Sequence, residues 1–213
     1  MIELVEVWPF IPKDRSGFAS SQRKDVITLK QKIRRFDEAL LFHVQRNQSK
    51  RLSVIMLAFS IVGNGGLIWF VVTGFLLFNP DTSRYGLYML CSLGLCALVS
   101  NLIFKPVFSR DRPCDIHSNV PLLIKRPIGS SFPSGHAATS FSCAVTLIHM
   151  DIRMGLIALL VAFIIAFSRI YLFVHYPSDI IFGILSGTAF GIIGIQIVRL
   201  FLYFVPIPYF AFH

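Results

Sequence analysis

The sequence carries little charge for its length. Only 15% of its 213 residues are charged, whereas 54% are hydrophobic, and soluble domains are charged at about a quarter of their positions. The apolar residues gather in runs close to the roughly 20 residues that a helix needs to cross a hydrocarbon core. This composition excludes an ordinary soluble domain and predicts an integral membrane protein.

Features of secreted proteins are also missing. The first 21 residues contain no basic flank followed by an apolar run and a small-residue cleavage site, so we expect no cleaved signal peptide. Cys91, Cys96 and Cys143 fall in apolar runs, and only Cys114 falls in a loop. Because disulfide frameworks use even sets of cysteines in loops, we expect free thiols that serve packing.

Basic residues outnumber acidic ones and give a formal net charge of +9, but no nucleic-acid-binding motif accompanies them. Eleven of the twenty Lys and Arg residues lie in positions 1–51, and five more lie in positions 105–126. This placement argues against nucleic acid as a partner. It favours anionic lipid headgroups and an anionic substrate.

Residues 1–51 form an N-terminal segment without a membrane span. Within it, residues 24–46 place apolar side chains at helical spacing, with charged residues between them. We predict an amphipathic helix that lies along the membrane surface with its basic face toward lipid headgroups. The alternative is a helix packed on the end of the membrane bundle.

Residues 52–213 form the membrane domain, which we predict to be all-α with five transmembrane helices. The predicted spans are residues 52–78, 85–104, 134–150, 154–174 and 179–204. A tight connection at residues 151–153 requires the third and fourth spans to run antiparallel side by side. A Gly-Asn-Gly-Gly run at residues 63–66, inside the first span, is interpreted as a helix-packing feature.

Polar residues stand at the ends of these spans in three clusters. The clusters are Lys105 with Arg112, then Ser134, Gly135 and His136, and then Arg169, His175 and Asp179. Because successive spans alternate in direction, all three clusters reach the same membrane face. We therefore expect them to form one site.

Three fixed cations, Lys105, Arg112 and Arg169, would converge in that site. The helix that starts at Ser134 and Gly135 would add unpaired backbone N–H groups and the positive end of its dipole. Guanidinium groups match phosphate oxygens, and three cations suit a dianion or a transferring phosphoryl group. The clusters thus predict a phosphate site.

Two histidines and one carboxylate complete the expected chemistry. Asp179 can accept a hydrogen bond from one ring nitrogen of His175 and leave the other nitrogen free to attack phosphorus. His136 is then available to protonate the leaving oxygen. A nucleophile, an orienting group and a proton donor are what phosphoryl transfer through a covalent intermediate requires.

Written as motifs, the clusters are Lys-x6-Arg-Pro at 105–113, Pro-Ser-Gly-His at 133–136 and Ser-Arg-x5-His-x3-Asp at 168–179. Together they resemble the three-part signature of the type 2 phosphatidic acid phosphatases, whose superfamily includes the vanadium haloperoxidases. The resemblance implies phosphate binding by Lys105, Arg112, Ser134, Gly135 and Arg169, and catalysis by His136, His175 and Asp179. Asp111 and Pro106 depart from the usual pattern without removing a motif residue.

Five spans with a surface helix resemble the shorter bacterial members of that family, which act on undecaprenyl diphosphate. The resemblance implies this lipid as the substrate and the bacterial inner membrane as the location. Phosphatidylglycerol phosphate, phosphatidic acid and diacylglycerol diphosphate stay open as substrates, and so does transfer to an acceptor other than water. Five spans argue against a vanadate-dependent oxidase, and a lipid carrier would have no use for the histidine and aspartate pair.

We expect no cofactor and no metal, because the chain offers no carboxylate cluster or Cys/His set suited to a metal ion. No obligate protein partner is indicated. Five spans place the N-terminus and the site on one side of the membrane and the C-terminus on the other. The basic N-terminal segment favours the cytoplasm for the site, whereas the resemblance to undecaprenyl phosphatases favours the outer face.

Overall fold

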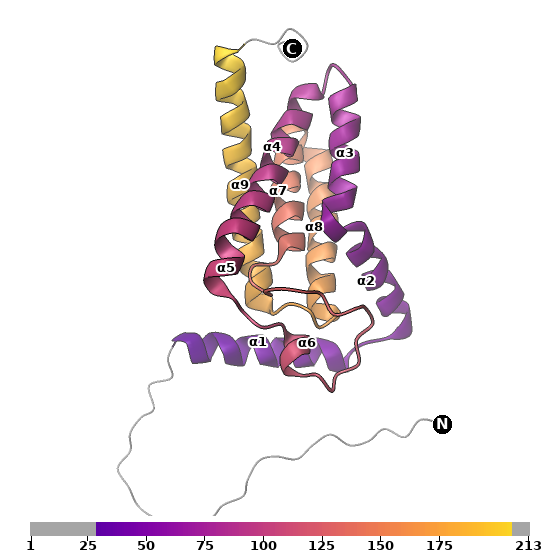
Figure 1. The fold of residues 1–213 in the computed structure, drawn as a ribbon. Coiled ribbons are helices and arrows are strands. Elements are labelled where there is room, and N and C mark those ends of the chain that lie inside the picture. Colours follow the sequence, from indigo (N-terminus) through magenta and orange to yellow (C-terminus); the bar gives the residue numbers. More distant parts are fainter. Residues whose placement is uncertain (1–28, 206–213) are drawn as a thin grey trace, which may run out of the picture.

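The computed structural model describes residues 29–205, and this part of the chain contains helices and no strand. Long helices stand side by side in a bundle, and helix α1 (Leu29–Arg46) lies across one end of it (Figure 1). The last helix, α9 (Pro177–Phe204), ends at the opposite end of the bundle. The predicted all-α class is confirmed, and α1 and the end of α9 lie at opposite ends of the bundle.

The first predicted span is a broken helix pair. It consists of α2 (Lys50–Val62), a 3-10 turn at Asn64–Gly66 and α3 (Leu67–Phe78), with a bend of 46°. Gly65 and Gly66 have φ angles of 60° and 77°. A side chain would strain the backbone in this left-handed region, so these two glycines permit the break.

The second predicted span changes its helical geometry before it ends. Helix α4 (Ser83–Val99) passes into a π-helical turn at Ser100–Phe104 and then into α5 (Lys105–Phe108). The short α6 (Pro113–Ile116) follows, and an irregular loop leads on to the next helix. Single π-helical turns are frequent at functional sites, and this one directly precedes Lys105.

Helices α7 (Gly135–Met150) and α8 (Ile152–Tyr171) form the expected antiparallel pair with a one-residue connection. Asp151 Oδ1 accepts the backbone N–H groups of Arg153 and Met154 at 2.9 and 3.0 Å. The side chain therefore caps the start of α8 and fixes the reversal of the chain.

Helix α9 packs closely on α7 because it carries a glycine at every fourth position of their contact. A Cβ atom at Gly183 or Gly191 would lie 2.8 Å from a backbone carbonyl oxygen of α7 or its N-cap, and one at Gly187 would lie closer still. Small residues let helix backbones approach in this way inside membranes. The close contact holds the start of α9 beside the start of α7, where the predicted site residues lie.

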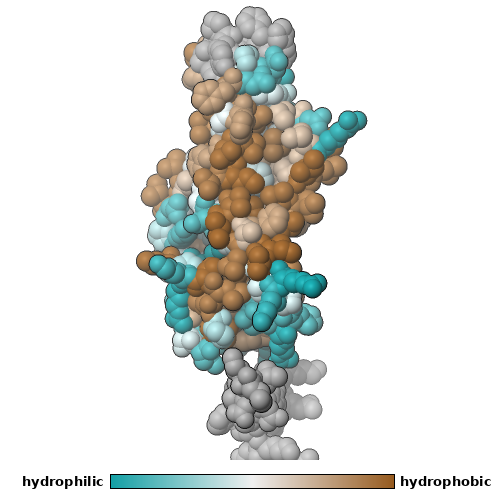
Figure 2. All heavy atoms as spheres, turned by 90° about the vertical axis from the view of Figure 1, so that its right-hand side faces the viewer, coloured by the Kyte–Doolittle hydropathy of each residue, from teal (hydrophilic) through white to brown (hydrophobic). Residues whose placement is uncertain are grey.

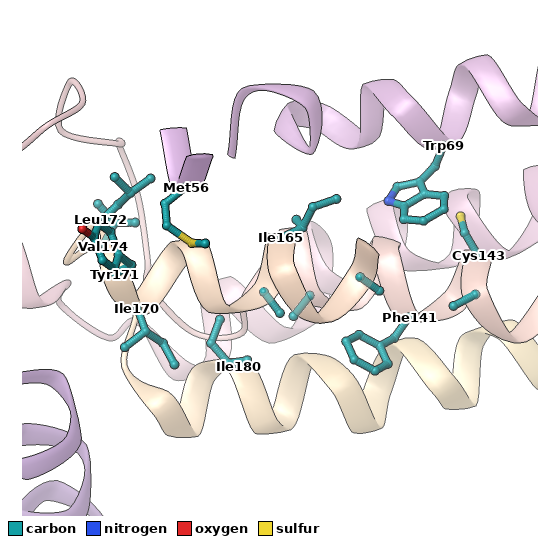
Figure 3. Packing of buried hydrophobic residues seen from close by; sticks show 14 of the residues in the cluster. Met56, Trp69, Phe141, Cys143, Ile165, Ile170, Tyr171, Leu172, Val174 and Ile180 are labelled. Atoms are coloured by element: carbon teal, nitrogen blue, oxygen red, sulfur yellow. The ribbon is translucent and has the colours of Figure 1, made fainter. Parts of the chain in front are cut away.

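Most of the buried apolar side chains form one large core cluster (Figure 3), and Cys96, Ala138 and Phe190 form a second, smaller one. A buried hydrogen bond links α3 to α7, because Trp69 Nε1 donates to Ser140 Oγ at 2.9 Å. Leu172 and Val174 are buried in the connection between α8 and α9. Their packing fixes the segment that carries His175.

Within residues 29–205, three helical stretches are long and apolar enough to cross a membrane: Ser83–Ile116, Ile152–Tyr171 and Pro177–Phe204. The bent α2–α3 pair makes a fourth if it counts as one span. Helix α7 has only 16 residues, fewer than the roughly 20 that a hydrocarbon core requires. It runs through the middle of the bundle (Figure 1), so neighbouring helices surround it. The five predicted segments are all helical, but α7 is shorter than a full span.

Hydrophobic side chains gather in the middle of the face shown in Figure 2, with hydrophilic residues toward both ends. Large apolar side chains are exposed on the helices, among them Phe75 and Leu102, which are 76% and 70% exposed. Large contiguous apolar surfaces are unusual on soluble proteins and match the lipid interior. The chain is an integral membrane protein.

Helix α1 shows features of both interpretations of the N-terminal amphipathic helix. Asp37 and Leu41 are buried against the bundle end, whereas Leu29, Ile33 and Phe36 are exposed. The helix thus packs on the bundle and also presents an apolar stripe away from it. The predicted residues 24–28 of this helix lie outside the described part of the chain.

Candidate active site

A cavity of about 320 Å³ lies at the end of the bundle where α4 and α8 finish and α7 begins. Six of the eight predicted site residues line it: Lys105, Arg112, Gly135, His136, Arg169 and His175. They come from different elements, so the fold brings the three sequence clusters together as expected. The same cavity is lined by the Gly63–Gly66 break between α2 and α3.

His175 lies in the connection between α8 and α9 and is 4% exposed. Its Nε2 atom is 3.1 Å from Arg112 Nη1, and its Nδ1 atom is 3.7 Å from Asp179 Oδ2. A guanidinium can only donate, so Nε2 accepts and the proton of the neutral ring lies on Nδ1, toward Asp179. The 3.7 Å separation is longer than the donor–acceptor distance of a hydrogen bond, which is at most about 3.2 Å.

The charge state of His175 follows from its surroundings. Burial lowers the pKa of His175 to about 4, with Arg112 and Arg169 acting in the same direction and Asp179 opposing them. The imidazole is therefore neutral at neutral pH. A neutral ring keeps one unprotonated nitrogen, here Nε2, whose lone pair can attack phosphorus once Arg112 turns its hydrogen bond to a bound phosphate.

Arg112 is fixed by backbone carbonyl groups on both sides. Its Nη1 donates to Val174 O at 3.0 Å, its Nε to Gly129 O at 3.0 Å and its Nη2 to Ser130 O at 3.2 Å. No carboxylate takes part in these bonds. The guanidinium keeps its full charge for the cavity and is held beside His175.

Arg169 and His136 approach each other across Ser60 of α2. Arg169 Nη1 donates to Ser60 Oγ, and His136 Nε2 lies 3.3 Å from Ser60 O. Arg169 is 5% exposed, and its Nε atom has no hydrogen-bond partner among the described residues. A buried guanidinium with a donor to spare suits an anion in the cavity.

Lys105 stands at the junction of the π-helical turn and α5. Its Nζ donates to Asn101 Oδ1 at 2.7 Å, one turn earlier. Both side chains line the cavity. The ammonium is held by a neutral amide, so this cation also keeps its charge for an anion.

Ser134 and Gly135 differ in their access to the cavity. Ser134 is the N-cap of α7 and is fully buried, and its Oγ accepts the backbone N–H of Ala137 at 3.5 Å. Its own N–H donates to Asp179 O at 3.2 Å. Ser134 therefore fixes the start of α7 rather than lining the cavity, while Gly135 in the first helical turn does line it.

The sequence analysis missed one feature of the site and interpreted another only in part. Arg110 lies 2.8 Å from Asp179 Oδ1, the carboxylate beside His175, and sequence reasoning gave Arg110 no role. Its position two residues before Arg112 in a membrane-face loop was the available signal. The Gly63–Gly66 run was interpreted as packing; Gly63 does pack, since a Cβ there would lie 2.7 Å from Ile165, but the run also forms cavity wall.

Among residues 29–205, no three His, Cys, Asp or Glu side chains gather into a group that could hold a metal ion. The cavity is instead lined by three basic side chains. Such a lining attracts a multiply charged oxyanion.

Histidines and fixed cations around one cavity of a helical membrane bundle fit an integral membrane phosphatase. Comparison with known proteins identifies the family, because residues 85–202 match the PAP2 superfamily. This match covers more than half of the chain. The chain belongs to the PAP2 superfamily and is a hydrolase that acts on phosphoric esters or diphosphates.

Known relatives agree with this family. The chain is 31% identical over 163 residues to an undecaprenyl-diphosphatase of Sulfolobus acidocaldarius, covering 76% of this chain and 78% of that protein. The crystal structure of Aquifex aeolicus LpxE is similar, with a TM-score of 0.63 and 29% identity over 75% of this chain and 94% of that one. A PAP2-type phosphatidylglycerolphosphate phosphatase from Bacillus subtilis has a TM-score of 0.61 over 82% of this chain and 88% of that one. At 23% identity, the latter supports the fold alone.

Proposed function

We propose that this phosphatase removes the terminal phosphate of a lipid diphosphate through a phosphohistidine at His175. His175 Nε2 attacks phosphorus, the bond to the leaving oxygen breaks, and His136 gives that oxygen a proton. Water then attacks the phosphohistidine, His136 takes the proton from the water, and phosphate leaves. Lys105, Arg112 and Arg169 neutralise the charge on the transferring group.

The observation that carries this proposal is the setting of the His175 ring. Its Nε2 faces Arg112 at 3.1 Å in the cavity, and its Nδ1 faces Asp179. A phosphate bound by Arg112 would thus lie against the attacking nitrogen, while Asp179 would stabilise the cationic ring that forms during attack. The N–H groups at the start of α7, including that of Gly135, supply further donors.

The lipid part of the substrate needs a path from the cavity to the membrane. The residues that line the cavity include the Gly63–Gly66 break and Cys96 and Ala97 of α4. We assign this part of the cavity to the alkyl chain next to the phosphate, because glycines without side chains leave room there.

Undecaprenyl diphosphate is the substrate that we favour. The support is the 31% identity to an undecaprenyl-diphosphatase over most of both chains, together with the short bundle. Phosphatidylglycerol phosphate, phosphatidic acid and diacylglycerol diphosphate present a similar terminal phosphate. We place the protein in the bacterial inner membrane, with the exposed Lys30, Lys32, Arg34 and Arg35 of α1 against anionic headgroups.

A panel of these four lipids tests the substrate. The purified full chain would be assayed in one detergent for released phosphate, and kcat/KM would be compared. We expect undecaprenyl diphosphate to give the highest kcat/KM; a higher value for another lipid would overturn the substrate assignment and leave the mechanism intact. Counting released phosphate against labelled acceptor in the same assay separates hydrolysis from phosphoryl transfer, and we expect stoichiometric phosphate.

A further inference from the structure

A carboxylate of α1 is buried at the end of the bundle. Asp37 has no exposed surface, although most of α1 is exposed. Its Oδ2 lies 2.7 Å from Arg110 Nη2, and its Oδ1 accepts the backbone N–H of Ser178 at 2.8 Å. The Ser178 hydroxyl lies 2.6 Å from Asp37 Oδ2. Both oxygens of this buried charge are paired, as burial of a charge requires.

Arg110 links Asp37 to Asp179. The Nη1 atom of Arg110 lies 2.8 Å from Asp179 Oδ1 and 2.7 Å from Ser178 Oγ. Its guanidinium carbon lies 4.0 Å from the centre of the Tyr176 ring, which covers the face of the group. A planar guanidinium can bridge two carboxylates in this way, whereas a lysine ammonium cannot reproduce the fork.

Asp179 in turn faces His175. Its Oδ2 accepts the backbone N–H of Tyr176 at 2.8 Å and lies 3.7 Å from His175 Nδ1. One oxygen of Asp179 is therefore held by Arg110 and the other by the backbone. If Arg110 moved, the carboxylate would lose one of the two bonds that set its rotation.

Asp37 also affects how far Arg110 neutralises the negative charge of Asp179. Two carboxylates share one guanidinium, so the group as a whole keeps one negative charge. Without the Asp37 carboxylate, Arg110 would pair with Asp179 alone and neutralise it. Asp179 would then stabilise a cationic His175 ring less well.

We propose that Asp37 and Arg110 are positioning residues of the phosphatase and that α1 is part of its catalytic apparatus. Asp37 holds Arg110, Arg110 orients Asp179, and Asp179 orients the His175 ring. Turnover then depends on α1 being docked on the bundle. This inference rests on the roles of His175 and Asp179 proposed above.

The first test compares two neighbouring carboxylates of α1. Asp37→Asn keeps the shape of the side chain and removes its charge, and we expect kcat to fall by about 10- to 100-fold because the nucleophile is misplaced. KM should change little, because the cations around the cavity are untouched. Glu38→Gln is the control, since Glu38 pairs with the exposed Arg34 at 2.9 Å and should keep both constants. Equal kcat values for the two variants would overturn the proposal.

A double-mutant cycle separates positioning from general stability. If Asp37 acts through Asp179, adding Asp37→Asn to Asp179→Asn should cost almost nothing beyond Asp179→Asn alone. A purely structural role of Asp37 would multiply the two losses instead, and that result would contradict the proposal. The thermal unfolding midpoint of each variant would be measured beside kcat.

Arg110 gives a second variant pair in case Asp37→Asn does not fold. Arg110→Lys should retain more turnover than Arg110→Gln, because it keeps a cation near Asp179; wild-type kcat in Arg110→Gln would refute the inference.

The same variants distinguish a failure of this inference from a failure of the proposed function. If Asp179→Asn loses turnover while Asp37→Asn and Arg110→Gln keep it, this inference alone is wrong. Wild-type turnover in Asp179→Asn would remove the proposed role of Asp179 and this inference with it.

Discussion

The two ends of the bundle contain the same kinds of residue in opposite settings. At the cavity end, His175 and Arg169 are 4% and 5% exposed and meet from different segments of the chain. At the other end, His149 and Arg199 are exposed and line a shallow hollow. The two ends therefore differ in how deeply these side chains are buried and in whether they meet around one cavity, and not in the types of residue present.

Solvation explains why the two ends differ. A basic side chain near the end of a long helix can extend to water or headgroups, as Arg199 can and as Arg84 does over the ring of Tyr85 at 4.8 Å. Arg169 also lies in the last turn of its helix, but it is buried inside the bundle and cannot extend outward in this way. A cation buried in a membrane bundle costs free energy, so its retention indicates an anion that it binds.

Replacing the two histidines should give the largest contrast. His175→Ala should lower kcat by about four orders of magnitude or more, because it removes the nucleophile. His149→Ala should leave kcat unchanged, because its ring contacts the rings of Tyr85 and Tyr88 and not the cavity. Phosphate release from the lipid substrate measures both. Comparable losses in the two variants would show that the cavity end is not special.

Replacing the two arginines should give the next largest contrast. Arg169→Gln should lower kcat/KM by about 100- to 1,000-fold, as loss of one preorganised group for the transition-state charge does. Arg199→Gln should stay near wild type, because it removes an exposed group far from the chemistry. The same assay with both variants checks this. A large loss of kcat/KM in Arg199→Gln, with none in Arg169→Gln, would place the active site at the other end of the bundle.

The loss in His136→Ala should depend on the leaving group. With a lipid substrate, whose leaving oxygen needs a proton, we expect a loss of about 100-fold or more. With an aryl phosphate that leaves as a stable phenolate, protonation matters less, and the loss should be smaller. Rates of His136→Ala and wild type on both substrates give the comparison. An equal loss on the two substrates would exclude His136 as the proton donor.

Removal of divalent metals should have the smallest effect. The cavity presents cations where a metal-dependent phosphatase would present carboxylates, so dialysis against EDTA should leave phosphate release unchanged. Loss of turnover that Mg²⁺ restores would contradict the mechanism.

Most of the fold was predictable, because apolar runs and the residues that interrupt them determine where helices lie in a membrane protein. Two details were not. The break at Gly63–Gly66 depends on left-handed backbone angles that the Gly-Asn-Gly-Gly run allows but does not require. The bounds of α7 were predicted to within one residue, but hydropathy does not report that this helix lies in the middle of the bundle.

The site residues that stand at the ends of the predicted spans could be identified from the sequence. The contacts between residues far apart in the sequence could not. Lys105, Arg112, His136, Arg169 and His175 line one cavity as expected. The pairing of Arg110 with both Asp37 and Asp179 was not foreseen, because Asp37 stands among charged residues of an amphipathic helix. Nothing in that pattern shows which of them is buried.

Trapping the covalent intermediate tests the central claim most directly. Wild-type protein would be mixed with substrate labelled in its terminal phosphate and quenched with base, under which phosphohistidine survives, and the labelled peptide would be mapped. We predict label on His175 in the wild type and none in His175→Ala, with His149→Ala labelled as the wild type. Label on another residue, or label that persists in His175→Ala, would contradict the account.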